Sequence, residues 1–141
     1  MTIKNYNELS KWIEKKKFQK RIHELSKKYE GKKVILYGAG LLASVMLDQY
    51  DLSTLNIIGV ADIRFFDGEI DFKGYKAISP FNISDYTPDV ILIANYNSYD
   101  VKDFLKENVL QELGKISIES IVKKNFKEKI EEFLVELSNS L

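Results

Sequence analysis

A glycine-containing turn is the segment whose residue types and spacing best suit ligand chemistry. Residues 33–43 (KVILYGAGLLA) match the pattern G-x-G-x-x-G/A, directly after a predicted strand and directly before a predicted helix. Gly38 permits the tight turn, and Gly40 lets a phosphate approach the backbone. The amides of Leu41 and Leu42, at the start of the helix, would face an anion and be assisted by the helix dipole. The pattern predicts a nucleotide-binding turn, with a purely structural turn as the alternative.

An acidic residue ends the second predicted strand and supports the same interpretation. Asp62 follows the glycine turn at roughly the distance, about 20 residues, at which a carboxylate holds a ribose hydroxyl. Arg64 stands two residues later, and its guanidinium would instead pair with a phosphate. The two side chains therefore leave open whether a ribose or a phosphate is recognised at this position.

A polar loop follows the fourth predicted strand. In open α/β sheets, ligands lie beyond the carboxyl ends of the strands, where the strand order reverses. Asn95 and Tyr96 are therefore predicted to lie opposite the glycine turn, where an amide and a phenol would hold a ribose, a pyrophosphate or a base edge. The alternative is a polar loop whose Asn and Ser side chains cap the next helix.

Alternating strands and helices are predicted to position these residues. Hydrophobic periodicity places strands at 33–37, 56–61, 75–78, 89–94 and 115–118, helices at 41–50 and 100–113, a helical turn at 81–86 and a loop at 65–74. Amphipathic helices at 5–30, with one irregular step at Phe18, and at 120–138 flank this core of residues 32–120. We expect one α/β domain over residues 1–141, with a doubly wound, mostly parallel five-stranded sheet in the Rossmann-like order 3-2-1-4-5.

The amino-acid composition argues against several classes of protein. Of the 141 residues, 45% are hydrophobic, so the chain can build a core and is not of the disordered class. Lys plus Arg and Asp plus Glu number 21 each, which gives no general reason to bind nucleic acid. With no cysteine, disulfides and Cys-based zinc sites are excluded. No apolar run is long enough for a membrane span and no signal-peptide pattern is seen, so a cytoplasmic location is expected.

A complete catalytic set is not expected. The Tyr-x-x-x-Lys spacing occurs at Tyr29 and Lys33, which are predicted far from the cleft, and His23 is interpreted as a surface or boundary residue of the first helix. The alternating carboxylates Asp67, Glu69 and Asp71 suggest either a divalent cation or a solvated loop, and the latter is favoured. An enzyme complete in this one chain is therefore the weakest hypothesis.

The segments KKVILYGAG, IIGVAD, FKGYKAIS and PDVILIA carry a family resemblance over about residues 32–120. They resemble the Rossmann-like domains attached to nucleotide-sugar dehydratases and epimerases, to sugar N-acetyltransferases and to sugar C-methyltransferases of polysaccharide biosynthesis. The resemblance implies a ligand at the glycine turn: NAD or NADP, with CoA or a UDP-sugar as alternatives. A histidine assigned to catalysis in the acetyltransferases has no counterpart here, because Leu41 and Leu42 follow the turn.

Two hypotheses of different classes remain. The first is a nucleotide-binding domain related to nucleotide-sugar-modifying enzymes, and not catalytic alone. The second is a protein-interaction or oligomerisation module, in which the aromatic faces of the terminal helices (Tyr6, Phe18, Tyr29, Phe126 and Phe133) bind a partner or a second copy. The predicted ligand contacts are Gly38, Gly40, Leu41, Leu42, Asp62, Arg64, Asn95 and Tyr96.

Overall fold

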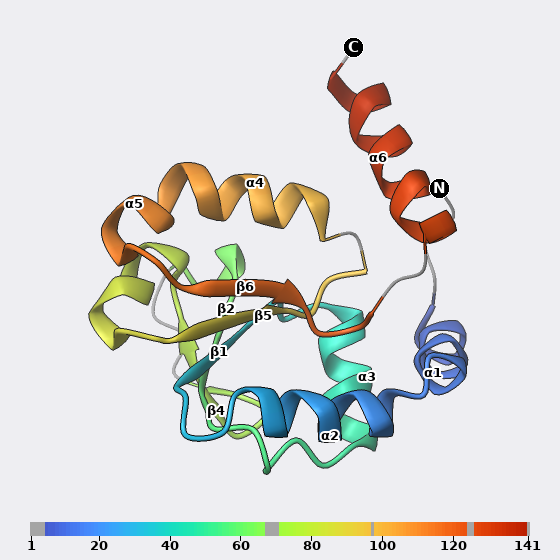
Figure 1. The fold of residues 1–141 in the computed structure, drawn as a ribbon, viewed down its shortest axis with the longest axis horizontal. Coiled ribbons are helices and arrows are strands. Elements are labelled where there is room, and N and C mark those ends of the chain that lie inside the picture. The colour runs from blue at the N-terminus through green and yellow to red at the C-terminus, as the bar shows by residue number, and fades with distance from the viewer. Residues whose placement is uncertain (1–4, 67–70, 97, 124–125, 141) are drawn as a thin grey trace.

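A mostly parallel six-stranded sheet forms the centre of the molecule (Figure 1). The computed structural model describes residues 5–66, 71–96, 98–123 and 126–140. The strands are β1 (Val34–Tyr37), β2 (Ile57–Ala61), β3 (Asp71–Phe72), β4 (Tyr75–Ile78), β5 (Val90–Ile93) and β6 (Ser117–Ser120). They lie in the order β3-β4-β2-β1-β5-β6, and only β3 runs antiparallel to its neighbour. The prediction of an α/β fold with a mostly parallel sheet is confirmed.

The predicted number of five strands is wrong, because the segment expected to be a loop at 65–74 contains β3. This strand forms a hairpin with β4, in which Phe72 lies opposite Tyr75. Lys73 and Gly74 between them both have positive φ, 50° and 89°. A two-residue turn with positive φ at both positions matches the right-handed twist of paired strands. The short 3₁₀ helix η1 (Ile63–Phe65) also falls partly in this segment.

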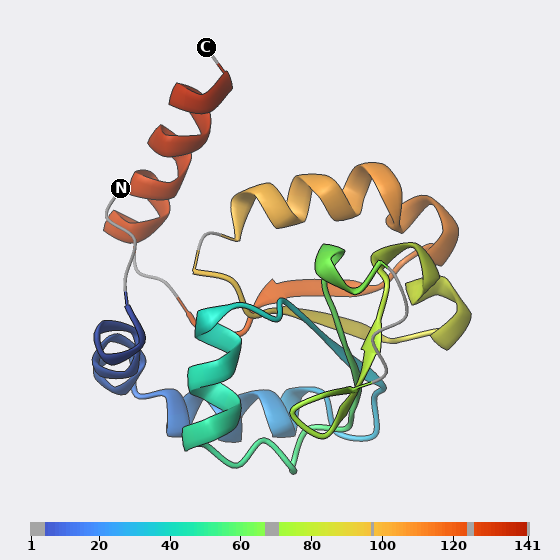
Figure 2. The same ribbon diagram turned by 180° about the vertical axis from the view of Figure 1, so that it is seen from behind.

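Helices cover both faces of the sheet (Figures 1 and 2). On one face lie α1 (Tyr6–Lys15), α2 (Phe18–Lys28) and α3 (Leu41–Gln49), packed on Val34, Leu36, Val60, Val90 and Leu92. On the other lie the 3₁₀ helix η2 (Pro80–Tyr86), α4 (Tyr99–Asn108) and α5 (Leu110–Leu113), packed on Ile35, Tyr37, Ile91 and Ile93. Central strands buried on both faces explain the uninterrupted apolar runs at β1 and β5.

The first predicted helix is in fact two helices. Lys17 adopts the left-handed conformation, with φ 55°, and separates α1 from α2 at the irregular step in the apolar spacing. The inward residues Leu9 and Ile13 of α1, and Phe18, Ile22 and Leu25 of α2, are buried in the core. The apolar face of the N-terminal helices is therefore buried in the protein's own core, with α1 packed against α3, and is not an exposed docking surface.

Glu119 fastens α2 to the edge strand β6. Its Oε1 accepts a 2.8 Å hydrogen bond from Arg21, and its Oε2 accepts one of 2.8 Å from Lys28 and another from the Tyr29 hydroxyl. Partial burial alone would raise the pKa of Glu119, but these hydrogen bonds outweigh that effect and bring the pKa to about 2. The carboxylate therefore stays charged at neutral pH and joins α2 to the sheet.

The C-terminal elements begin later than predicted. The last strand is shifted from 115–118 to Ser117–Ser120, and α6 (Phe126–Ser140) starts six residues after the predicted residue 120. Ile121 belongs to the core ahead of the helix and is fully buried. In both ribbon views α6 projects away from the rest of the molecule (Figures 1 and 2).

Candidate functional site

The carboxyl edge of the sheet brings together three of the predicted segments. Parallel pairing places Tyr37, the last residue of β1, opposite Ala61 of β2 and Ile93 of β5. The glycine turn, the segment from Asp62 and the loop containing Asn95 therefore leave the sheet side by side. The amide of Gly38 donates a 2.8 Å hydrogen bond to the carbonyl of Ala61, which holds the turn against the end of β2.

Gly38 is required by the close approach of the loop after β5. Its φ of +125° lies in a region that side-chain-bearing residues rarely adopt. A Cβ at this position would overlap Oδ1 of Asn95 and would lie 3.0 Å from the carbonyl oxygen of Ala94. The structure thus brings Asn95 directly against the glycine turn, as the sequence predicts.

Asp62 and the glycine turn are joined by hydrogen bonds. Oδ2 of this buried carboxylate accepts a 2.7 Å hydrogen bond from the amide of Ala39. Oδ1 accepts two of 3.0 Å, from the main-chain amide and from Nε of Arg64. Because a carboxylate offers about four lone-pair positions, most of its accepting capacity is used within the protein. The ribose contact predicted for Asp62 stays a prediction.

Arg64 also binds the turn. Asp62 and Arg64 together therefore form a clasp, by which the end of β2 is joined to the glycine turn at Ala39. Nη1 of Arg64 donates a 2.9 Å hydrogen bond to the carbonyl of Ala39, while Nε binds Asp62. A Cβ at Gly40 would find Nη2 of Arg64 3.7 Å away. The side chain of Arg64 is nevertheless 58% exposed, although its Nε and Nη1 donate hydrogen bonds within the protein.

The N-terminus of α3 lies at the same place. Gly40 is its N-cap, and in the described part of the chain no side chain caps this helix end. Its first main-chain amides point out of the helix start, where partial positive charge collects. Leu42 is buried under the helix and Leu41 is exposed, so Leu41 forms part of the accessible rim.

Tyr96 faces a residue that the sequence analysis did not single out. Its ring packs edge-on against Trp12 of α1, with ring centroids 4.9 Å apart. Nε1 of Trp12 in turn donates a 3.0 Å hydrogen bond to Glu128 of α6. The available sequence signal was the position of Trp12 three residues after Leu9, next to the inward stripe of α1.

Tyr37 lies under the site. Burial, together with the negative charge of Asp62, raises the pKa of this phenol. It therefore stays neutral throughout the physiological range. Its ring is the first in a row of aromatic rings that goes on with Phe104, Phe81 and Phe66. The centroids of successive rings lie 6.1–6.4 Å apart.

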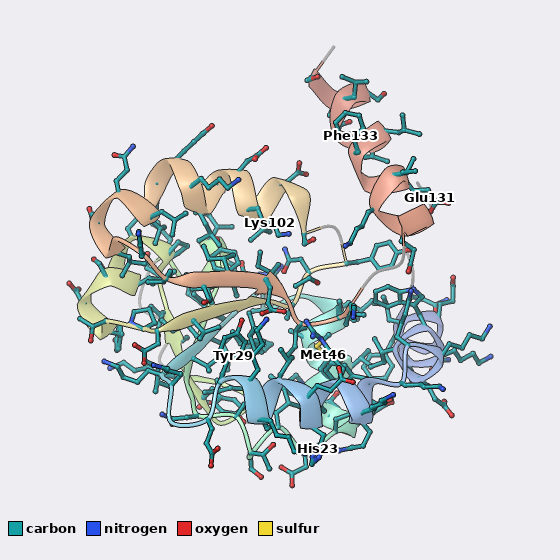
Figure 3. All side chains as sticks on the ribbon, viewed as in Figure 1. His23, Tyr29, Met46, Lys102, Glu131 and Phe133 are labelled. Atoms are coloured by element: carbon teal, nitrogen blue, oxygen red, sulfur yellow. The ribbon has the colours of Figure 1, made fainter. Side chains whose placement is uncertain are left out.

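The remaining candidates lie elsewhere. His23 is exposed on α2 (Figure 3), which agrees with its interpretation as a surface residue. Asp67 and Glu69 fall outside the described residues, and among those described no group of three potential metal ligands is found. A groove of about 660 Å³, lined in part by Lys28, Lys32, Pro88 and Lys115, lies at the amino ends of the strands and contains none of the predicted contacts.

Fold and site together define an α/β domain with a mostly parallel sheet and a glycine turn at its carboxyl edge. A family model described as C2185-like, N-terminal, matches residues 30–112, which is more than half of the chain. The chain belongs to this C2185-like N-terminal family. No curated protein and no solved structure matches it. None of the helices described has the length and apolar character needed to cross a bilayer.

Proposed function

We propose that this domain binds a phosphate-bearing nucleotide at the carboxyl edge of its sheet. The ligand class is that of NAD, NADP, CoA or a UDP-sugar, and the phosphate lies between the start of α3 and Arg64. The observation that carries the proposal is the exposed guanidinium of Arg64 beside Gly40, at a helix end that no described side chain caps. A cation and converging main-chain amides are the groups that bind phosphate in proteins.

The sheet supports the same proposal. Its parallel strands lie in the order β4-β2-β1-β5-β6, which supports the proposed Rossmann-like arrangement. In such sheets the ligand lies where the strand order reverses, here between β1 and β5. Gly38 and Asn95 meet at that point.

The clasp assigns different roles to the two charged residues. Arg64 is the ligand contact, because its guanidinium is exposed and carries the complementary charge. Asp62 is a positioning residue, since its oxygens hold the amide of Ala39 and Nε of Arg64. A phosphate would gain charge-assisted hydrogen bonds from Arg64 without displacing Asp62.

Thermal unfolding with and without ligand tests the proposal. NAD, NADP, UDP-glucose, acetyl-CoA and inorganic pyrophosphate are each added at millimolar concentration, and a bound ligand raises the melting temperature by mass action. We expect at least one of the nucleotides to raise it, and Arg64→Gln to abolish most of the increase. Lys20→Gln, which removes one exposed cation on α2, is the matched control and should leave the increase intact. No increase with any of these compounds would refute the proposal.

A further inference from the structure

The loop that follows β5 is held by contacts on two sides. At its start, Oδ1 of Asn95 lies so close to Gly38 that a Cβ on this glycine would overlap it. The next residue, Tyr96, packs edge-on against Trp12 of α1, with ring centroids 4.9 Å apart. The loop then leads into α4, which begins at Tyr99. Because Asn95 and Tyr96 are neighbours in the chain, a shift of Tyr96 would also move Asn95 at the border of the proposed nucleotide site.

The C-terminal helix α6 is attached beside this loop. Glu128, in the first turn of α6, accepts a 3.0 Å hydrogen bond from Nε1 of Trp12 and forms an ion pair with Lys16 of α1. The helix also contacts α4, the element into which the loop runs. In both ribbon views the rest of α6 projects away from the molecule (Figures 1 and 2). The attachment of α6 therefore lies next to the proposed site.

The contact with Glu128 fixes the orientation of the Trp12 ring. The side chains of Lys16 and Glu128 are 18% and 19% exposed, so the charged acceptor is largely shielded from water. A hydrogen bond from an N–H to a carboxylate is directional and is stronger than one between neutral groups. The indole ring also packs against the core on this face of the sheet. Trp12 is therefore held in the orientation in which its ring meets Tyr96.

We propose that α6 regulates the nucleotide site, with Glu128 and Trp12 as positioning residues; this inference rests on the proposed function. While Glu128 holds Trp12, the indole ring supports Tyr96 and keeps Asn95 at the glycine turn, so that the loop is ordered before the ligand binds. When this contact is broken, binding must order the loop as well, and the affinity falls. By linkage, a bound nucleotide strengthens the attachment of α6 by the same factor.

Calorimetric titration of the full chain with NAD, NADP, UDP-glucose and acetyl-CoA in turn tests this regulation. For a compound that binds the wild type, Glu128→Ala should weaken the affinity by about fivefold, at the low end of couplings between sites. Glu128→Gln keeps an acceptor oxygen for Trp12 and should restore most of the affinity. Glu131→Ala, at an exposed glutamate of the same helix (Figure 3), is the matched control and should have no effect.

A double-mutant cycle identifies the hydrogen bond between α1 and α6 as the link. Trp12→Phe keeps an aromatic ring against Tyr96 but lacks the N–H that Glu128 accepts. It should therefore weaken nucleotide binding by itself. The double variant Trp12→Phe with Glu128→Ala should bind no more weakly than Glu128→Ala alone, because both changes remove the same hydrogen bond.

Amide hydrogen exchange of the free protein, measured by NMR, tests the positioning of the loop without any nucleotide. In Glu128→Ala the amides of Asn95 and Tyr96 should exchange about fivefold faster relative to the amide of Leu92, because the loop opens locally more often. Leu92 is fully buried in β5 and reports on the stability of the core. A contact that only stabilised the whole fold would leave these relative rates unchanged.

Three results would overturn the proposal. The first is wild-type nucleotide affinity in Glu128→Ala. The second is unchanged relative exchange of Asn95 and Tyr96 in that variant. The third is an affinity in Glu128→Gln as low as in Glu128→Ala, which would assign the effect to the ion pair with Lys16 and not to Trp12. A wild type that binds none of the four compounds refutes the proposed function, and the exchange rates then show separately whether α6 positions the loop. Circular dichroism verifies that each variant is folded.

Discussion

The carboxylate of Asp62 accepts a 2.7 Å hydrogen bond from the main-chain amide of Ala39, and so joins the end of β2 to the middle of the glycine turn. The same carboxylate holds Arg64 through Nε, and Arg64 returns to the carbonyl of Ala39. The turn is therefore clamped on its amide and its carbonyl side by two neighbouring side chains. We expect the stability of this edge to depend on Asp62, and the proposed ligand binding to depend on Arg64.

Removing the carboxylate of Asp62 should destabilise the protein. Asp62→Ala leaves the amide of Ala39 buried without its acceptor, so the free energy of unfolding should fall by about 2 kcal/mol. Asp62→Asn keeps an acceptor oxygen and should cost about half as much, or about 1 kcal/mol. Urea denaturation measures both. Asp85→Ala, at an exposed aspartate, should stay within about 0.5 kcal/mol of the wild type. Equal values for Asp62→Ala and Asp85→Ala would contradict a structural role for the clasp.

Substitutions at the two glycines of the turn should have different effects. Gly38→Ala should reduce the stability of the fold, and Gly40→Ala should weaken nucleotide binding. Gly38→Ala introduces a Cβ into Asn95 at a φ of +125°, and should lower the free energy of unfolding by about 2 kcal/mol or more. Gly40→Ala meets only Arg64, at 3.7 Å, and its φ of −90° suits any residue. It should change stability by less than about 1 kcal/mol. The methyl group nevertheless occupies the space proposed for the phosphate, so calorimetric titration should show weaker nucleotide binding. Unchanged affinity in Gly40→Ala would place the phosphate elsewhere.

Glu119 should make part of the free energy of unfolding vary with pH in the acidic range. Its pKa in the folded protein is about 2, below the ordinary value of 4.5, so its charged form is favoured by folding. This contribution is complete above pH 4.5 and is lost as the pH falls towards 2. Glu119→Gln should therefore unfold more easily than the wild type at pH 7, by about 1–2 kcal/mol, and the difference should shrink in acid. Chemical denaturation at several pH values measures it, with Glu107→Gln, an exposed glutamate on α4, as the control. A difference that does not change with pH would refute this assignment.

Trp12 should report ligand binding by its fluorescence. It is the single tryptophan of the chain and lies 4.9 Å from Tyr96, in the loop that borders the proposed site. A nucleotide that contacts this loop should change the intensity or wavelength of Trp12 emission, and the change should saturate with ligand concentration. Arg64→Gln should shift the saturation to higher concentration while leaving the emission of the free protein unchanged. An emission that stays constant while calorimetry detects binding would show that the ligand does not reach Tyr96.

The sequence determined those features that depend on local patterns. Continuous apolar runs identified β1, β2 and β5, because strands buried on both faces leave no room for polar residues. The glycine spacing identified the turn, since an unusual φ and a close neighbour both demand the smallest residue at position 38. The irregular apolar step at Phe18 marked the break between α1 and α2, although it was not interpreted as a boundary.

Only the tertiary structure decided which groups meet. The local sequence does not show that the carboxylate of Asp62 accepts hydrogen bonds from Ala39 and Arg64. It also does not show that Trp12 packs on Tyr96, or that the Glu119 carboxylate links α2 to β6. The helices at the two ends of the chain are a second example. All are amphipathic, but the apolar face of α1 and α2 is buried, whereas apolar side chains of α6 are exposed. Periodicity reports that a face is apolar, whereas the partner of that face is set by contacts between residues far apart in the chain.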